Sequence, residues 1–375
     1  MRGLNNKKNI LITTMTFIII FLLLLLVIHA YVYWHVWTML PFTSTWKTAI
    51  LSAMTLSFAC LFLYLSPAQD KMPMMIARFV YELGTSWLII FLYLFLIYLL
   101  IDICIIFHLF SRSITIYSVP FSVGITMFIV LLLFCGNVRY NHKYKRELDI
   151  KTSKFVKKPY KLLMCSDLHL GYNNTKDEFK RWVDLINDEK PDIILIAGDI
   201  IDGNIRPLEE ENIAKVFKSL NAPIYACLGN HEYLAGKERS ISFYKECGIQ
   251  LLVDSVTTFN ELNIIGRDDK YNPSRQSLHT LTKSLDNTRF TILLDHQPYN
   301  LEEAASCGID LQLSGHTHHG QIWPINWVTD IIYECAYGEY DKGKTKYFIS
   351  SGLGIWGGKF RICTTSEYLV INIDK

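Results

Sequence analysis

The sequence predicts two parts: an N-terminal all-α bundle of about four membrane-spanning helices, and a C-terminal α/β domain built as a four-layer α-β-β-α sandwich. Two observations carry this prediction. Half of the 375 residues are hydrophobic, and the long apolar runs with few charges are confined to residues 1–138. From Arg139 onward, short apolar runs alternate with helical patterns and a β-rich end follows, which favours two sheets packed face to face with helices outside.

Four apolar runs reach the length of about 20 residues that a membrane-spanning helix needs. Tyrosine and tryptophan gather near their ends, as is typical of residues at a membrane interface. The first run could instead be a cleaved signal peptide, but its apolar core is too long and three more runs follow. Asp102, an acidic residue near the end of the third run, is expected at the interface. The predicted spans within the transmembrane domain, 1–138, cover about 10–31, 48–65, 83–107 and 114–138.

The distribution of lysine and arginine predicts the side of the membrane that the second part occupies. Nine of these residues fall between Arg139 and Lys161, whereas segments 32–47 and 108–113 carry one each. Basic segments stay cytoplasmic. We therefore expect a multi-pass protein of the cell (inner, cytoplasmic) membrane with a cytoplasmic C-terminal domain. Residues 139–158 are interpreted as a basic juxtamembrane linker, and residues 159–375 as the domain.

The C-terminal domain is predicted from runs of strand and helix patterns. Helices end where glycine or turn residues occur, as at Gly248. Residues 321–375 look mostly β. Strands are expected at 160–165, 191–198, 222–229, 289–295 and 310–315, and helices at 176–189, 207–220, 236–248, 273–285 and 299–306.

Polar residues follow five of these strands, at the point where each strand ends. Ligands bind open sheets beyond the carboxyl ends of strands. Each fragment alone has another interpretation: a turn, a helix N-cap or a structural histidine. Together they supply more nitrogen and oxygen donors than one ion can hold, which favours two divalent metals. The residues are Asp167 and His169, Asp199, Asn230 and His231, His296, and finally His316 and His318, with His319 facing the other way in an extended chain.

Five blocks of this sequence resemble the signature blocks of the calcineurin-like metallophosphoesterase superfamily. They are "SDLHLG" (166–171), "AGDIIDG" (197–203), "LGNHEY" (228–233), "LDHQP" (294–298) and "SGHTHHGQ" (314–321). The resemblance covers about 160–375, and "SSGLGIWGGKFRI" (350–362) is similar to the membrane-anchored branch with a multi-span N-terminus. It implies the metallophosphoesterase type of sandwich and a metal-dependent hydrolase of phosphoric ester or phosphoanhydride bonds.

The resemblance also implies a role for each site residue. Asp167, His169 and His318 would hold one metal ion. Asn230, His296 and His316 would hold a second, and Asp199 would bridge the two. His231 would be catalytic and face the phosphoryl group, Asp202 would orient its neighbours, and His319 would be structural. Carboxylate and imidazole ligands suit Mn²⁺, Fe or Zn²⁺, and the resemblance favours Mn²⁺.

Two such ions can generate hydroxide from a bridging water near neutral pH, and this hydroxide attacks phosphorus. A membrane anchor and a basic segment favour a lipid-linked phosphodiester or pyrophosphate; some relatives of this fold cleave the pyrophosphate of UDP-diacylglucosamine. The alternatives are soluble phosphomonoesters or nucleotides as substrates, and a non-catalytic membrane scaffold, which predicts lost ligands.

A net charge of +2 carries no signal for nucleic-acid binding, and the oligomeric state stays open. Four basic residues are candidate contacts for substrate phosphate, with salt pairing as the alternative for each: Arg267, Lys270, Lys359 and Arg361.

Overall fold

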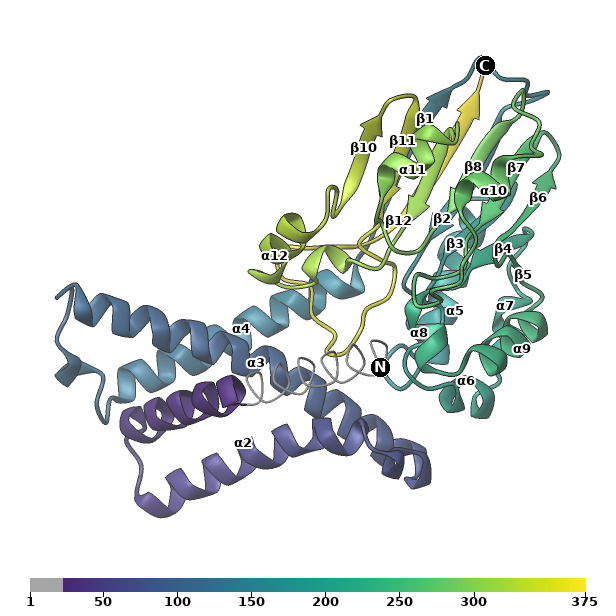
Figure 1. Cartoon of the computed structure of the whole chain (residues 1–375). Helices are drawn as coiled ribbons and strands as arrows, with labels where there is room; N and C mark the ends of the chain where they lie inside the picture. Colours follow the sequence, from purple (N-terminus) through teal and green to yellow (C-terminus); the bar gives the residue numbers. More distant parts are fainter. Residues whose placement is uncertain (1–22) are drawn as a thin grey trace, which may run out of the picture. The chain divides into compact units, whose positions relative to one another are not determined.

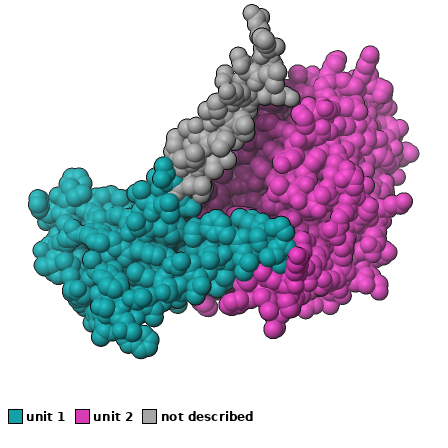
Figure 2. Space-filling model, turned by 60° about the horizontal axis from the view of Figure 1, so that its bottom comes forward, with its two compact units in different colours: residues 1–69, 83–132 teal, residues 70–82, 133–375 magenta. Residues whose placement is uncertain are grey.

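The computed structural model describes residues 23–375, and the chain divides into two compact units (Figure 2). Unit 1 comprises residues 1–69 and 83–132, and unit 2 comprises residues 70–82 and 133–375. Parts of two long apolar helices therefore fold with the C-terminal domain rather than with the rest of the helical unit.

Three helices within the described residues are long and apolar enough to cross a membrane (Figure 1). They are α2 (Ser44–Tyr64), α3 (Met74–Ile106) and α4 (Val119–Asn141), and they overlap three of the predicted spans. A shorter apolar helix covers Leu23–Met39. The predicted span 10–31 lies in large part outside the described residues. The 3-10 helices η1 (Pro67–Lys71) and η2 (Arg112–Ile114) stand between the long helices.

In unit 1, Asp102 has defined partners. Its Oδ2 accepts a hydrogen bond of 2.8 Å from the Tyr31 hydroxyl and lies 3.0 Å from Nε2 of His35. The carboxylate is 27% exposed. An acidic side chain inside an apolar helix is costly unless it is paired, and these two groups supply the pairing.

Unit 2 contains two six-stranded sheets (Figure 1). The first has the order β1 (Lys143–Lys151), β12 (Ser366–Asp374), β2 (Tyr160–Cys165), β3 (Ile193–Ala197), β4 (Ile224–Cys227) and β5 (Gln250–Leu251). The second has the order β10 (Gly338–Lys342), β11 (Thr345–Ile349), β9 (Leu311–Ser314), β8 (Phe290–Leu294), β7 (Leu262–Gly266) and β6 (Ser255–Phe259). The runs β2–β5 and β7–β8–β9–β11 are parallel.

Alternation along the strands builds the layers. In β2, Leu162 and Met164 join the core between the sheets, whereas Leu163 and Cys165 join the core beneath the helices, as the two-residue period of a strand requires. Helices of the first sheet are α5 (Lys176–Asp188), α6 (Arg206–Glu210), α7 (Ala214–Phe217), α8 (Asn230–Leu234) and α9 (Lys237–Cys247). The second sheet carries α10 (Leu278–Thr282) and α11 (Leu301–Ser306), and η3 (His318–Gly320) and α12 (Ile325–Ile332) follow β9.

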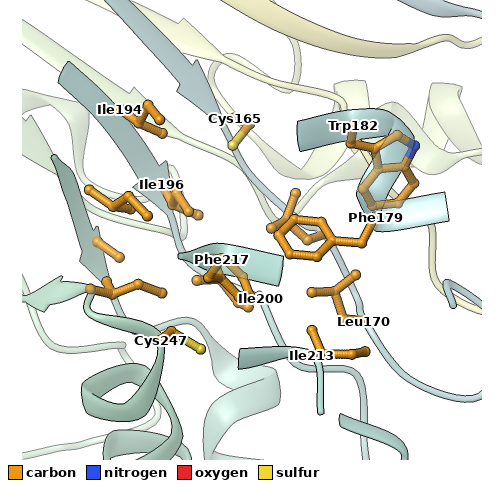
Figure 3. Close-up of a cluster of buried hydrophobic side chains, with 14 of the residues drawn as sticks. Cys165, Leu170, Phe179, Trp182, Ile194, Ile196, Ile200, Ile213, Phe217 and Cys247 are labelled. Atoms are coloured by element: carbon orange, nitrogen blue, oxygen red, sulfur yellow. The ribbon is translucent and has the colours of Figure 1, made fainter. Parts of the chain in front are cut away.

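Helix α5 shows how the outer helical layer packs on the first sheet. Its buried residues Phe179, Trp182, Val183 and Ile186 follow the spacing of one helix face. They pack with Cys165 and Ile196 of the sheet (Figure 3). Burying each large apolar side chain contributes about 1.5–3 kcal/mol. With α10 and α11 over the second sheet, the predicted four-layer sandwich is confirmed.

Three details differ from the sequence-based expectations. The segment interpreted as a linker, 139–158, contains β1, which pairs with β12 over nine residues. The interpretation as a linker is wrong for residues 143–151. Their basic side chains belong to an edge strand, and Leu148 and Ile150 pack in the core between the sheets. The helix expected at 207–220 is broken into α6 and α7. The end expected to be β contains α12, whose isoleucine, valine and threonine mimic a strand pattern.

Candidate metal centre

Both sheets of unit 2 deliver polar residues from the carboxyl ends of their strands. β2, β3 and β4 are followed by Asp167, Asp199 and Asn230, and β8 and β9 by His296 and His316. Five of the seven candidate ligands have positive φ, between 43° and 70°: Asp167, His169, Asp199, His316 and His318. Such conformations cost on the order of 1 kcal/mol each and cluster at functional sites.

Glycines let these segments approach one another. Gly198 has a φ of 80°, and a Cβ there would lie 2.7 Å from Nδ1 of His296. A Cβ on Gly315 would collide with the Asp167 carboxylate and the Ser166 hydroxyl. Glycine at both positions is therefore a steric requirement of the site.

The first group of converging side chains is Asp167, His169 and His318. Nε2 of His169 lies 3.0 Å from Nε2 of His318, and Oδ1 of Asp167 lies 3.4 Å from Nε2 of His318. Asp167 and His169 are buried, the His318 side chain is 12% exposed, and the ligand atoms of the three fall within 4.8 Å of one another. Two imidazole nitrogens that face each other beside a carboxylate form a donor set for a divalent cation.

The second group is Asp199, His296 and His316. Oδ2 of Asp199 lies 3.0 Å from Nε2 of His296 and 3.8 Å from Nε2 of His169, so this carboxylate stands between the two groups. Nδ1 of His296 donates to the carbonyl of Ala197 at 2.7 Å, which leaves Nε2 for a ligand.

Metal binding requires neutral imidazole and ionised carboxylate, and three groups of the site meet this requirement. Burial, with positive neighbours, lowers the pKa of His316 to about 3 and that of His318 well below its usual value. Burial opposes ionisation of Asp199, but His296 and His231 outweigh it and hold its pKa well below the usual range. Burial also lowers the pKa of His296, yet the Asp199 carboxylate raises it well above the usual value. The ring of His296 therefore favours a proton, which a metal ion would displace on binding, and burial likewise raises the pKa of Asp167.

Divalent metals fit this site. Within the described residues, Oδ1 of Asn230 is buried without a hydrogen-bond partner. Buried polar atoms are normally satisfied, and coordination would satisfy this one. The structure therefore brings six of the seven predicted ligands into two groups of converging side chains. The seventh, Asn230, lies at the end of β4, at the same edge of the first sheet as Asp167 and Asp199.

His231 differs from its neighbours. Its side chain is 15% exposed, whereas that of His169 is fully buried. Nδ1 of each ring lies 3.4 Å from Oδ1 of Asp202, so one carboxylate faces both rings. Burial lowers the pKa of His231, but Asp199 and Asp202 outweigh it and raise the pKa to about 9. His231 also lies close enough to His169 and Asp199 to form a third potential ligand group.

Two residues at the site escaped sequence reasoning. Glu232 is fully buried and accepts backbone hydrogen bonds from Gly229 at 2.8 Å and from Asp199 at 3.1 Å, which fixes the loops after β3 and β4. Its position beside His231 is the signal that could have found it. Tyr81, in the part of α3 that belongs to unit 2, donates to Oδ2 of Asp202 at 2.7 Å. Nothing in the apolar sequence around it points to this contact.

The basic residues proposed as phosphate contacts have other partners. Arg361 is fully buried and donates to the carbonyl of His318 at 2.8 Å, so its interpretation as a phosphate contact is wrong. Arg267 pairs with Asp295 and Glu303, Lys359 pairs with Glu178, and Lys270 lies 3.6 Å from the Tyr299 ring centroid.

His319 lies outside the ligand groups of this site. Its ring stacks on Tyr337 with centroids 4.5 Å apart, and its Nε2 lies 3.6 Å from Oδ1 of Asp330.

Comparisons with known proteins agree with this geometry. Residues 160–320 match the family model of the calcineurin-like phosphoesterases. The chain is 30% identical over 261 residues to an uncharacterized metallophosphoesterase of Aquifex aeolicus, covering 66% of this chain and 98% of that relative. The chain belongs to the calcineurin-like phosphoesterase family. Membership indicates a phosphoesterase domain that binds divalent metal ions.

Two further relatives of this calcineurin-like phosphoesterase are informative. An uncharacterized metallophosphoesterase of Campylobacter jejuni is 32% identical over 257 residues, covering 65% of this chain and 68% of the relative. A transmembrane protein with a metallophosphoesterase domain from Danio rerio is 27% identical over 226 residues, covering 55% of this chain and 51% of the relative. Together with helices α2, α3 and α4, the second relative indicates a membrane protein.

Proposed function

We propose that this chain is a membrane-anchored, dinuclear-metal phosphoesterase that hydrolyses phosphodiester or pyrophosphate bonds. The observation that carries the proposal is the place of Asp199 between two groups of ligands. Asp167, His169 and His318 would hold one ion, and Asn230, His296 and His316 the other, with Asp199 shared. Mn²⁺ is the proposed metal, and Fe or Zn²⁺ would suit the same donors.

The proposed reaction assigns separate roles to the metal ions, His231 and Asp202. Bound in this site, two divalent ions would lower the pKa of a water and neutralise charge on the phosphoryl oxygens. Burial lowers the pKa of His231, but Asp199 and Asp202 raise it to about 9, which favours the protonated ring, and His231 would give its proton to the leaving oxygen. Asp202 would hold the ring in place through Nδ1.

We propose a lipid-linked phosphodiester or pyrophosphate as substrate, with soluble phosphomonoesters or nucleotides as the second candidate. Support comes from the candidate membrane helices and from the cluster of basic residues between Arg139 and Lys161. Hydrolysis by the full chain should be tested, because a fragment that starts near residue 150 would cut β1 and lack Tyr81.

The expected result is a kcat/KM at least about tenfold higher for a lipid-linked pyrophosphate than for a soluble nucleotide. The purified chain, loaded with Mn²⁺ in mixed micelles, is assayed for phosphate or headgroup release from both substrates. A tenfold preference corresponds to about 1.4 kcal/mol, which partial burial of one acyl chain readily supplies. Equal rates on soluble nucleotides, unchanged by micelles, would contradict the lipid assignment.

We also propose that the catalytic domain is cytoplasmic, because the basic segment after the last span dominates the charge bias. Cys363 in unit 2 is exposed, so its labelling shows on which side of the membrane the domain lies. In a variant with the other exposed cysteine removed, Cys135→Ala, a membrane-impermeant maleimide should label Cys363 in inverted vesicles and spare it in intact cells. Labelling in intact cells would place the domain outside.

A further inference from the structure

Helix α12 presents its apolar side outward. Trp327 is 58% exposed, Ile331 84% and Ile332 59%. At 100° per residue, Trp327, Val328, Ile331 and Ile332 share one face, and α12 contains no buried residue. Asp330, on the other side of the helix, lies 3.6 Å from His319. The usual pattern of a surface helix, apolar inward and polar outward, is therefore reversed.

Hydrogen bonds within unit 2 connect this helix to the end of α4. Backbone N–H of Arg361 donates to the carbonyl of Gly136 at 3.0 Å, and the Asn137 amide donates to the carbonyl of Lys359 at 3.0 Å. The next residue, Ile362, bridges to Ile322 and accepts from the N–H of Trp323. Helix α12 begins at Ile325, two residues after Trp323.

This connection places α12 close in space to the C-terminal end of a candidate span. Gly136 precedes the last residue of α4, Asn141, by five residues, or about 7 Å of helix. A residue this close to the end of a candidate span is expected at the level of the lipid interface, where tryptophan is enriched. Trp356, in the same closing segment as Lys359, is 41% exposed and adds a second aromatic side chain.

Two of the candidate metal ligands, His316 and His318, lie close to α12. The helix follows η3, which contains His318 and His319. Its C-terminal neighbour Tyr333 has its ring 6.2 Å from the ring of His316. Anything that seats the apolar face of α12 therefore also fixes how far the metal ligands stand from that surface.

We propose that α12 is an interfacial helix that inserts its apolar face into the membrane carrying α4, and so presents the metal centre to phosphate groups attached to lipids. This inference rests on the proposed function and deepens it, because it names a phosphate at headgroup level as the substrate class. An exposed apolar face of this size is a binding surface rather than an ordinary solvent boundary. Continuity with α4 identifies the bilayer as its occupant.

The direct test measures the depth of Ile331 in the full chain. In an Ile331→Cys variant reconstituted in vesicles of phosphatidylglycerol and phosphatidylethanolamine, a spin label should be more accessible to oxygen than to a water-soluble nickel chelate. The matched control is Ile241→Cys on α9, an isoleucine 37% exposed in the same unit, where the chelate should have freer access. Equal chelate access at both positions overturns the inference. A label at Ile331 shielded also in detergent, with a doubled molecular mass, assigns the face to a second copy and overturns it too.

The kinetic test uses Trp327→Gln combined with Ile331→Gln. The apparent KM for a lipid-linked pyrophosphate in vesicles should rise about tenfold, while hydrolysis of soluble bis(p-nitrophenyl) phosphate and the bound metal stay unchanged. Ile241→Gln is the control. Equal losses on both substrates, or an unchanged KM for the lipid substrate, overturn the inference. If the label is deep and the soluble substrate is nonetheless preferred by the parent chain, α12 still docks on lipid and it is the proposed substrate that fails.

Discussion

Replacing Asp199 by asparagine is expected to lower kcat/KM by at least about 10²-fold and to reduce the bound metal, because the carboxylate would serve both of the proposed ligand groups. Its Oδ2 lies 3.0 Å from Nε2 of His296 and 3.8 Å from Nε2 of His169. A neutral amide offers one oxygen and no charge to share. Metal content measured on the purified variant, together with kcat/KM on a soluble diester, checks both parts.

A second buried carboxylate separates this effect from a general loss of buried charge. Asp268 is 1% exposed and pairs with Lys237 at 2.8 Å, away from the ligand groups. Asp268→Asn should reduce thermal stability while the folded enzyme keeps its metal and most of its rate. Asp199→Asn with two bound ions and a near-normal rate would refute the bridging role.

The layered fold could be predicted because its signal is local. Each strand of β2, β3, β4, β8 and β9 is a compact apolar run, and two-residue alternation sorts its side chains between two cores. β1 could not be predicted in this way. In "KYKRELDIK", Leu148 and Ile150 alone enter the core between the sheets, and the partner strand β12 is the last of the chain. A basic edge strand and a basic linker look alike until that partner is known.

Some residues of the candidate site could likewise be predicted from local sequence, and others could not. Asp167, Asp199 and His296 could be placed together because each follows a recognisable strand, and parallel strands bring their ends to one edge. Tyr81 could not, because it lies 121 residues from Asp202 within an apolar helix. The predicted span begins near residue 83, and nothing in the preceding segment indicated that the first turns of this helix, which include Tyr81, fold with the C-terminal domain. Contacts of this kind depend on tertiary packing, which no local pattern records.

Replacing His231 by alanine is expected to leave both metal ions bound and to lower kcat by about 10²–10⁴-fold, the usual contribution of a positioned general acid. Its Nδ1 lies 3.4 Å from Oδ1 of Asp202, and although burial lowers its pKa, Asp199 and Asp202 raise it to about 9, which favours the protonated ring. The loss should be smaller for a p-nitrophenyl ester, whose leaving oxygen needs little protonation, than for an alkyl ester. Metal content and the two rates are measured on the same preparation.

Two graded variants decide whether His231 is an acid or a third metal ligand, since it also lies near His169 and Asp199. Tyr81→Phe removes the hydroxyl that holds Asp202, a hydrogen bond to a charged group that contributes about 1.5–3 kcal/mol. It should therefore lower kcat about tenfold or more, again with the greater loss on the alkyl ester and with metal retained. His319→Ala, a histidine stacked on Tyr337, should change neither rate by more than about twofold. Because ligand loss depletes metal and slows both esters alike, a fall in metal that matches the fall in rate for His231→Ala would make His231 a ligand instead.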